Sequence, residues 1–287
     1  MKNNKQLRMK VHMKIPRIII DEIKEDRKLK KLKKKIWGIL SLQNAIYLCL
    51  YYLIYYPSMK TLELEFGYSH TNFNNLLEKF LKYIQSYSKK KLKPYSKEKC
   101  SEISKEKIKK KKFLTELLHD SSDWPLTKRD SLRKKSPYHS FKLNCHGIKY
   151  QYSVSNDMRI QFLSKFFLPK KYDSECMQEI RNLFHARFEG GWKILADGHY
   201  KTMEEKWKSS HWICPIRKRK NEEFSLKEKN YNRAQKNTRS RIEKVFSDLT
   251  QCWGCLKSKW RGSEIKHQEF MFLASAIYNK KRALLEI

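Results

Sequence analysis

The stretch that decides the fold is residues 192–200, WKILADGHY, in which a short apolar run ends at Asp197. A short apolar run of this kind is typical of a buried strand, and it delivers the residue that follows it to the edge of a sheet. A second such run places Asp120 within LLHDSSDWPL, and Glu243 lies in RSRIEKVF on a helical pattern. We therefore expect a folded chain to bring three distant acids into one pocket.

Three convergent carboxylates suit a pair of divalent cations, either Mg²⁺ or Mn²⁺, because both are hard ions that prefer oxygen ligands. In two-metal sites, ions about 3.5–4 Å apart activate the attacking oxygen and stabilise the leaving oxygen of a phosphodiester. We expect Asp120 to bridge both ions, with Asp197 and Glu243 each completing one. The three acids thus predict a metal-dependent enzyme that acts on phosphodiester bonds.

The charge of the chain indicates the partner. Lysine and arginine number 64 against 30 acidic residues, which gives a net charge of +34. Such a surface attracts a polyphosphate and releases its counterions. Taken alone, any single lysine run favours a solvated tail or linker, and only the total charge indicates a polyphosphate partner. A basic ribonucleoprotein component would explain the charge but not the acids. Together, the charge and the acids favour DNA. The basic blocks are residues 30–35, 89–91, 109–112 and 217–220.

Beyond residue 113 the pattern mixes strands and helices. Apolar runs and turn residues predict an α/β domain, a mixed sheet flanked by helices. We expect a turn at His146 and Gly147. Strands are predicted at residues 113–119, 138–145, 149–154, 159–164, 192–196 and 212–215, and helices at 173–188 and 226–249.

The helix predicted at 226–249 permits a geometric check. Asn232, Lys236, Arg239 and Glu243 follow helical spacing and share one polar stripe. A carboxylate that reaches a metal at the sheet edge would lie on this stripe. Arg239, one turn before Glu243, is expected either to orient that carboxylate or to contact a phosphate oxygen in a bidentate manner. A surface ion pair is the alternative interpretation.

Two lysines of the predicted sheet are further candidates for DNA contacts. Lys142 and Lys149, together with Arg239, are expected to clamp phosphates, and ion-pair duty is the alternative. Asp123 and Asp173 are interpreted as turn or cap residues, since a carboxylate that begins a helix complements its dipole.

The N-terminal part contains a long apolar stretch at residues 36–56. It nearly reaches the twenty or so residues that cross a bilayer. Ser41, Gln43 and Asn44 interrupt it, and several tyrosines follow. We therefore predict a buried helix and no membrane partner, with a membrane span as the alternative.

The next residues resemble a helix-turn-helix. Ser58 can cap a short helix, Gly67 can supply the turn, and Ser69 or Thr71 can cap the following helix. Apolar residues at 73, 76, 77, 80, 81 and 84 share one face of that second helix. Its polar face suits a DNA groove, although an ordinary helical hairpin has the same pattern. The candidate DNA-binding residues are His70, Asn72, Asn74, Asn75 and Lys79.

These patterns divide the chain into four parts. We predict a basic arm at 1–35, a helix-turn-helix module at 36–85, a Lys-rich linker or weak helix at 86–112, and the α/β domain at 113–287. The seven cysteines have no regular spacing, which favours a reducing compartment. Cys252 and Cys255 form a lone CxxC. We expect helix-end packing there, and a zinc site that also uses Cys214 and His267 is the alternative.

From Asp120 to Asn279 the chain resembles the DDE superfamily endonuclease domain of Harbinger-type transposases. The resemblance rests on the order and spacing of several motifs: Asp120 to Leu126 for D-G-T-x-x-P-I; Tyr138, Ser140, Lys142, His146, Lys149 and Gln151; Tyr172-Asp173 for a histidine-aspartate pair; Leu195 to Tyr200 for L-A-D-x-G-Y; and Asn232, Arg239, Glu243 and Phe246.

The resemblance implies a ribonuclease-H-like fold, preceded by the all-α helix-turn-helix module, and a DDE-type nuclease that cuts and joins DNA at transposon ends with Asp120, Asp197 and Glu243 as metal ligands. It leaves open a separate DNA-binding accessory protein and a homodimer. With the lysine clusters, it implies nuclear localisation in a eukaryote and cytoplasmic localisation otherwise.

The chain departs from the family pattern at several positions. Phe141 replaces a small residue, Ser121 a glycine and Tyr172 a histidine, and a glycine is missing near Pro169. The alternative is therefore a domesticated or degenerate DNA-binding protein that retains the scaffold without catalysis. All three candidate acids are present, which favours metal binding.

Overall fold

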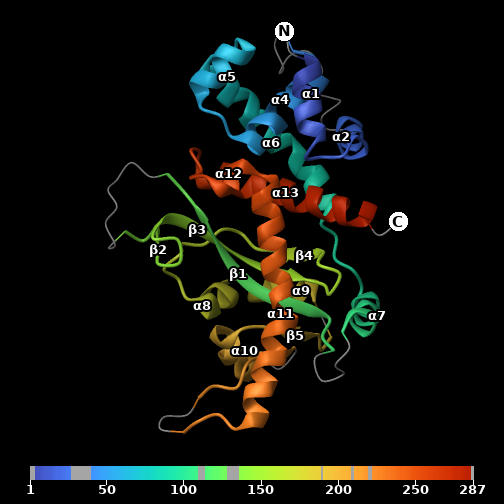
Figure 1. Ribbon diagram of the computed structural model, residues 1–287, viewed down its shortest axis with the longest axis vertical. Helices are drawn as coiled ribbons and strands as arrows, with labels where there is room; N and C mark the ends of the chain where they lie inside the picture. Colours follow the sequence, from blue (N-terminus) through green and yellow to red (C-terminus); the bar gives the residue numbers. More distant parts are fainter. Residues whose placement is uncertain are drawn as a thin grey trace. The chain divides into compact units, whose positions relative to one another are not determined.

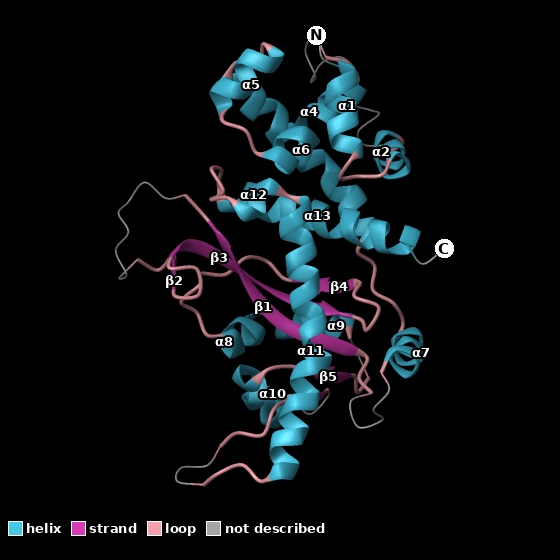
Figure 2. Ribbon diagram, viewed as in Figure 1, coloured by secondary structure: helices cyan, strands magenta, loops and turns pink. Residues whose placement is uncertain are grey.

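The computed structural model describes residues 4–26, 40–108, 114–127, 136–188, 190–207, 210–218 and 222–285. The chain forms two compact units. One, here called the helical unit, comprises Met1–Leu92 and Asp248–Ile287, and the other, the sheet unit, comprises Lys93–Ser247. Figure 1 shows the elements along the chain, and Figure 2 shows that strands are confined to the sheet unit.

The sheet unit is built on a mixed sheet with the strand order β2-β3-β1-β5-β6, in which β4 also pairs with β3. β1 runs parallel to β5 and antiparallel to β3. β5 in turn runs parallel to β6. The strands are β1 (Leu117–Pro125), β2 (His139–Ser140), β3 (Cys145–Val154), β4 (Ile160–Leu163), β5 (Lys193–Leu195) and β6 (His211–Ile213).

Helices cover both faces of this sheet, and strand alternation determines which residue faces which helix. On one face, Tyr152 of β3 contacts Phe246 of the long helix α11. On the other face, His119 of β1 makes edge contacts with Phe184 and Tyr200. The helices that contribute to this unit are α7 (Lys97–Lys107), α8 (Asp173–Glu179), α9 (Arg181–Arg187), the 3₁₀ helix η2 (Gly198–Tyr200), α10 (Lys201–Lys206) and α11 (Leu226–Cys252).

A large aromatic core lies on the α8–α10 face of the sheet. Phe184 of α9 stacks near Phe188, Trp207 and Trp212, and all four side chains are buried. Aromatic side chains bury a large apolar area and favour offset or edge contacts, which makes them effective anchors for short elements. The core thereby holds the short strands β5 and β6 in the sheet, although each has only three residues.

The first strand differs from the sequence prediction. Asp120 was expected to follow a strand at 113–119, but β1 begins at Leu117 and continues through Asp120 to Pro125. The reason is tertiary, because β3 pairs with β1 antiparallel from Leu118 to Pro125. Residue 113, where the predicted strand begins, lies outside the described part of the chain. Asp120 therefore lies within a strand, and its side chain lines the pocket from the middle of β1 rather than from its end.

The predicted turn at His146 and Gly147 is also wrong. Both residues belong to β3, and the turn is formed instead by residues 141–144, where Asn144 has a φ of 51°. Asparagine tolerates this left-handed conformation better than most residues. Gly147 is needed in the strand itself, because an added Cβ would lie 2.9 Å from the carbonyl oxygen of Trp124.

The strand predicted at 138–145 is wrong over most of its length, because only residues 139–140 form β2 and residues 141–144 form the turn. The other predictions for this unit agree closely with the structure. The strands predicted at 159–164, 192–196 and 212–215 contain β4, β5 and most of β6. The helix predicted at 173–188 is divided into α8 and α9 at Ile180. In the predicted linker, residues 97–107 form α7, as the weak-helix alternative anticipated.

The helical unit contains α1 (Asn4–His12), α2 (Arg17–Lys24), α4 (Leu42–Tyr55), α5 (Met59–Phe66), α6 (His70–Lys91), α12 (Gly254–Lys257) and α13 (Glu264–Leu285). Residues 45–54 of α4 are all buried, in agreement with the buried helix predicted at 36–56. Residues 36–39 of that prediction lie outside the described residues. Within the described ranges, no helix has the length and apolar character that crossing a membrane requires.

The local signals around α5 and α6 act as predicted. The Ser58 side chain accepts a hydrogen bond from the backbone of Thr61, and Ser69 caps α6 through the backbone of Asn72. Gly67 ends α5 with a φ of 70°. The six apolar positions from 73 to 84 are buried. Whether this helix pair is a DNA-binding helix-turn-helix stays a prediction, as does the division of the chain into four parts.

Candidate active site

A pocket of about 560 Å³ lies at an edge of the sheet. β5 pairs with β1 only at Leu117 and Leu118, so the following part of β1 has no strand on that side in the described chain. The pocket brings together all six sheet-unit residues proposed from the sequence. Its lining comprises Asp120, Ser121, Asp123, Phe141, Lys142, Lys149, Pro169, Lys170, Lys171, Tyr172, Asp173, Ser174, Asp197, His199, Arg239 and Glu243.

Three different kinds of element present the three predicted acids. Asp120 lies in β1, and Asp197 follows β5 after Ala196 and is the N-cap residue of η2. Asp197 is held by its own cap, because Oδ1 accepts a hydrogen bond of 2.7 Å from the backbone N–H of His199. Glu243 lies on α11 and is exposed. The acids are distant in the sequence but line one pocket.

Asp120 is the most constrained of these acids. One oxygen accepts a hydrogen bond from the backbone of Ser121, and the other lies 2.5 Å from Nη1 of Arg239. Both side chains of the ion pair are only 15 % exposed. Burial raises the pKa of Asp120 to about 6, the charge of Asp197 adds to the rise, and Arg239 opposes it. The sequence suggested Glu243 as the partner of Arg239, and the structure pairs it with Asp120.

The lysines of the pocket differ in their surroundings. Lys149 is buried and donates to Asp173 at 3.0 Å and to the carbonyl of Lys171 at 2.8 Å, the ion-pair arrangement considered as its alternative role. Lys142 is exposed, and its charge lowers the pKa of Asp120. Lys142 therefore faces solvent near an acid, where a phosphate could reach it.

Asp123, Asp173 and His146 have mainly structural contacts. Asp123 accepts a hydrogen bond of 2.5 Å from Ser140, and burial raises its pKa. Asp173 begins α8, as the interpretation as a cap predicted. His146 is buried in β3 and does not line the pocket.

Helix α11 is attached to this region by two amide side chains. Gln235 is buried and donates a hydrogen bond of 2.6 Å to the carbonyl of Ala196, the residue before Asp197. Asn232 bonds both the N–H and the carbonyl of Ile216. Sequence reasoning placed Asn232 on the polar stripe but missed Gln235. A polar residue among the apolar positions of α11 was the signal that could have identified it.

The pocket also contains residues that sequence reasoning did not assign to the site. Lys170 and Lys171 were missed, although they form a basic pair directly before the Tyr172-Asp173 motif. His199 was missed, although it lies within the L-A-D-x-G-Y motif. Phe141 and Tyr172 were noted only as departures from a pattern.

The donor chemistry of the pocket fits a divalent cation. Carboxylate oxygens are the ligands that Mg²⁺ and Mn²⁺ prefer. Burial, and to a lesser extent the charge of Asp197, raise the pKa of Asp120, so an added positive charge would stabilise its ionised form. In the present side-chain arrangement of the described residues, no three His, Cys, Asp or Glu side chains are close enough to hold an ion. Arg239 supplies the positive charge at Asp120 instead.

The other proposed site residues belong to the helical unit. His70, Asn72 and Asn74 lie in the first turn and a half of α6, where Asn74 and His70 are hydrogen-bonded at 2.9 Å. Cys252 ends α11 and Cys255 is buried in α12. These five residues do not line the pocket that holds the acids.

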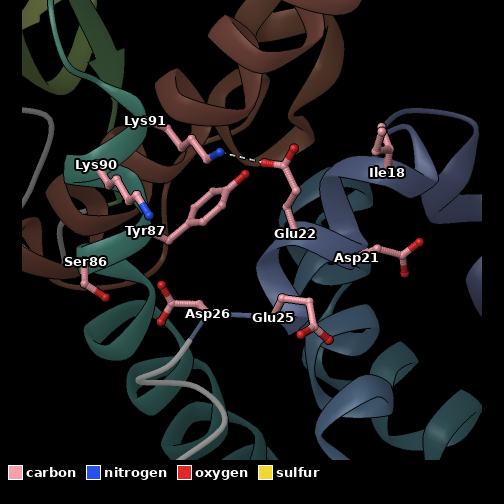
Figure 3. A pocket seen from close by; sticks show the side chains of 9 residues that line it. All are labelled: Ile18, Asp21, Glu22, Glu25, Asp26, Ser86, Tyr87, Lys90 and Lys91. Carbon is pink, nitrogen blue, oxygen red and sulfur yellow. Dashed lines mark ion pairs between the residues drawn. The ribbon is translucent and has the colours of Figure 1, made fainter.

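A larger cavity of about 870 Å³ lies in the helical unit, lined by α2 and the end of α6 (Figure 3). Two of its acids are engaged in ion pairs, since Glu22 pairs with Lys91 at 2.8 Å and with Lys280 at 2.6 Å, and Asp21 pairs with Lys24. The hydroxyl of Tyr87 lines it without a hydrogen-bond partner in the described residues. We therefore assign the candidate active site to the pocket of the sheet unit.

Comparison with known proteins identifies the family of the chain. Neither a curated protein nor a solved structure matches the chain significantly. Residues 119–279 match the family described as DDE superfamily endonuclease, which covers more than half of the 287 residues and includes Asp120, Asp197 and Glu243. A mixed sheet flanked by helices is consistent with a nuclease fold of this family. On the extent of this match, the chain belongs to the DDE superfamily endonuclease family.

Proposed function

We propose that the protein is a Harbinger-type transposase or a nuclease derived from one, which cuts and joins DNA phosphodiester bonds at transposon ends. The proposal includes a ribonuclease-H-like fold for the sheet unit and a nuclear site of action in a eukaryotic cell. The observation that carries it is the single pocket lined by Asp120, Asp197 and Glu243. Membership of the endonuclease family supports the class of reaction.

We assign Asp120, Asp197 and Glu243 as ligands for two divalent ions, Mg²⁺ or Mn²⁺. Bound there, these ions would supply Lewis-acid stabilisation of the charge that develops on the phosphoryl oxygens. Asp120 suits this role because a pKa of about 6 leaves its carboxylate mostly ionised at pH 7. Asp197 keeps a fixed orientation through its cap to His199.

The cationic side chains around the acids are assigned to the DNA backbone. Lys142 is exposed at the pocket, and Arg239 has a buried Nε without a hydrogen-bond partner in the described residues. A guanidinium can contact two phosphate oxygens at once. We propose that Arg239 exchanges Asp120 for a phosphate when the substrate enters. Lys149, buried against Asp173, acts by holding the start of α8.

The experiment that tests the proposal is a nicking assay on supercoiled DNA with Mg²⁺ or Mn²⁺. Asp197→Asn and Glu243→Gln should each reduce cleavage at least about 100-fold, because a lost metal ligand removes several kcal/mol of transition-state stabilisation. Glu223→Gln, which changes an exposed acid outside the pocket, is the matched control. Unchanged cleavage by Asp197→Asn would remove this residue from the mechanism.

Metal titration distinguishes catalysis from the non-catalytic alternative, because both predict salt-sensitive DNA binding. Calorimetry with Mn²⁺ should show binding at millimolar concentrations or below and a marked loss in Asp120→Ala. If the wild type binds no Mn²⁺ with or without DNA, the protein is a DNA-binding module that retains the scaffold.

We further propose that α5 and α6 contact DNA through His70, Asn72 and Asn74. Ordered caps and an exposed first turn of α6 support this role. Asn72→Ala should weaken binding to the recognised sequence by about 1–3 kcal/mol while leaving affinity for unrelated DNA unchanged, as expected for a base contact. An equal loss on both DNAs would indicate a phosphate contact. An accessory DNA-binding protein or a second copy of the chain remains compatible with this arrangement.

A further inference from the structure

Two aromatic side chains at the candidate active site face solvent. Phe141 is 75 % exposed and Tyr172 is 71 % exposed, and both line the pocket that contains the three acids. Among the described residues of the sheet unit, no other large aromatic side chain is exposed to this degree. The other large rings of this unit, such as Phe184 and Trp212, are packed in its core. Exposed aromatic rings of this unit are therefore found at the pocket that contains the three acids.

Ordered backbone holds both rings. Phe141 lies in the turn between β2 and β3, and its ring makes an edge contact with the ring of His139 at 5.2 Å. Tyr172 is the N-cap residue of α8, and its backbone N–H donates a hydrogen bond to the carboxylate of Glu175. Exposed apolar rings on a fixed backbone can stack on a ligand at a small entropic cost.

Positive charge accompanies each ring. Lys142 follows Phe141, and Lys170 and Lys171 precede Tyr172, and all three lysines line the same pocket. Lys171 forms an ion pair with Glu179, so the phosphate contacts are assigned to Lys142 and Lys170. Aromatic platforms interleaved with lysines are the arrangement that binds single-stranded nucleic acid, because rings stack on bases while lysines follow the phosphates. In a paired duplex the faces of the bases are covered by their neighbours. A ring can stack on a base only where that base has separated from a neighbouring base.

We propose that Phe141 and Tyr172 form a stacking site for unpaired bases, so that the preferred substrate is DNA whose strands are separated beside the phosphate to be cut. This proposal rests on the nuclease function proposed above and names its substrate class.

The test compares two labelled DNAs of the same mixed sequence, one fully paired and one with three mismatched pairs at its centre. Binding of the full-length protein is measured by fluorescence anisotropy in EDTA, so that no strand is cut. The wild type should prefer the mismatched DNA. Phe141→Ala and Tyr172→Ala should each lose about tenfold in affinity for the mismatched DNA, with affinity for paired DNA unchanged within about twofold, because the stacking partner exists only in the opened strand.

Two further variants separate stacking from general damage. Tyr172→Phe keeps the ring and should bind as the wild type does. Leu183→Ala removes an exposed apolar side chain of α9 outside the pocket, 55 % exposed, and should leave both affinities unchanged. With 2-aminopurine at a mismatched position, binding by the wild type should quench its fluorescence, and the two alanine variants should not.

Two results overturn the inference. One is equal affinity of the wild type for the two DNAs. The other is a preference for mismatched DNA that persists in both alanine variants. Either result would leave the proposed nuclease function intact, since that depends on the acids. Failure of the wild type to bind either DNA would instead overturn the DNA-directed function together with the stacking site.

Discussion

At the scale of single residues, Asp120 carries the main electrostatic conflict of the candidate site. Burial and the charge of Asp197 both raise its pKa, and Arg239 opposes them from 2.5 Å. The guanidinium thus lies where a metal ion would bind the same oxygen. If Asp120 binds a metal ion as proposed, the Arg239 guanidinium and that ion compete for the same carboxylate.

We predict that Arg239→Gln destabilises the protein and strengthens metal binding. Loss of the guanidinium should lower the free energy of unfolding by about 1–3 kcal/mol, less than for a fully buried pair because both side chains are partly exposed. Without the competing cation, the affinity for Mn²⁺ in the absence of DNA should rise several-fold. Urea unfolding and calorimetry measure the two effects, with Arg233→Gln, an exposed arginine of α11, as the control. An unchanged Mn²⁺ affinity would contradict the competition.

His119 makes stability depend on pH. It is buried beside Asp120 and hydrogen-bonded to Ser153 and Gln151, and burial lowers its pKa to about 4. Between pH 6.5 and 4 the unfolded chain takes up a proton that the folded chain does not accept. The stabilising contribution of neutral His119 is therefore complete above pH 6.5 and is lost as the pH falls through this window.

We predict that His119→Asn reduces this pH dependence. The wild type should lose up to about 3 kcal/mol of stability through this residue on acidification from pH 7 to pH 4. His119→Asn should be less stable at pH 7 but should change less across the window. Urea unfolding at several pH values provides the measurement. His211→Asn, an exposed histidine of β6, is the control, and equal slopes for wild type and His119→Asn would refute the prediction.

At the scale of elements, α11 connects the acids. It presents Arg239 and Glu243 to the pocket, and Gln235 bonds the carbonyl that precedes Asp197. A short strand such as β5, with only three residues, needs this support to hold the residues that follow it in place. The helix therefore positions an acid that it does not itself carry.

We predict that Gln235→Ala lowers both stability and activity. The carbonyl of Ala196 would lose its partner in a buried place, which costs about 1–3 kcal/mol of unfolding free energy. Cleavage should decline more than the loss of folded protein explains, because Asp197 is no longer held. Denaturant unfolding and the nicking assay test this, and Lys236→Ala, at an exposed neighbouring position, is the control. Activity equal to that of the wild type at equal folded fraction would disprove the positioning role.

At the scale of the whole molecule, the net charge of +34 dominates the interaction with DNA. We predict a steep decrease of DNA affinity with salt, about −0.9 in logarithmic slope for each phosphate neutralised. Lys142→Gln should make the slope shallower by about 0.9, as the loss of one contact requires. Lys193→Gln, an exposed lysine outside the pocket, serves as the comparison. Equal slopes for Lys142→Gln and the wild type would exclude a phosphate contact by Lys142.

The organisation into two units was only partly predictable. Composition separated a helical N-terminal part from a sheet domain, and the structure does contain a helical unit and a sheet unit. Residues 248–287, however, belong by their contacts to the helical unit, although the sequence pattern joins them to the preceding domain. Which surface covers the apolar face of α13 is a long-range property that no local pattern contains.

The sequence by itself determined the elements whose causes are local. The caps at Ser58 and Ser69, the left-handed Gly67 and the amphipathic spacing of α6 and α11 depend on neighbours within a few residues, and they were predictable. Spacing and resemblance also identified the three acids that line one pocket.

Tertiary structure alone decided the rest. The extension of β1 past Asp120 depends on pairing with β3. The ion pair of Arg239 joins it to Asp120, which is 119 residues away in the sequence. Phe141 and Tyr172 are exposed because no other element of the described fold packs over their rings. Pairing, desolvation and burial are properties of groups that meet only when the chain has folded, so a local pattern cannot encode them.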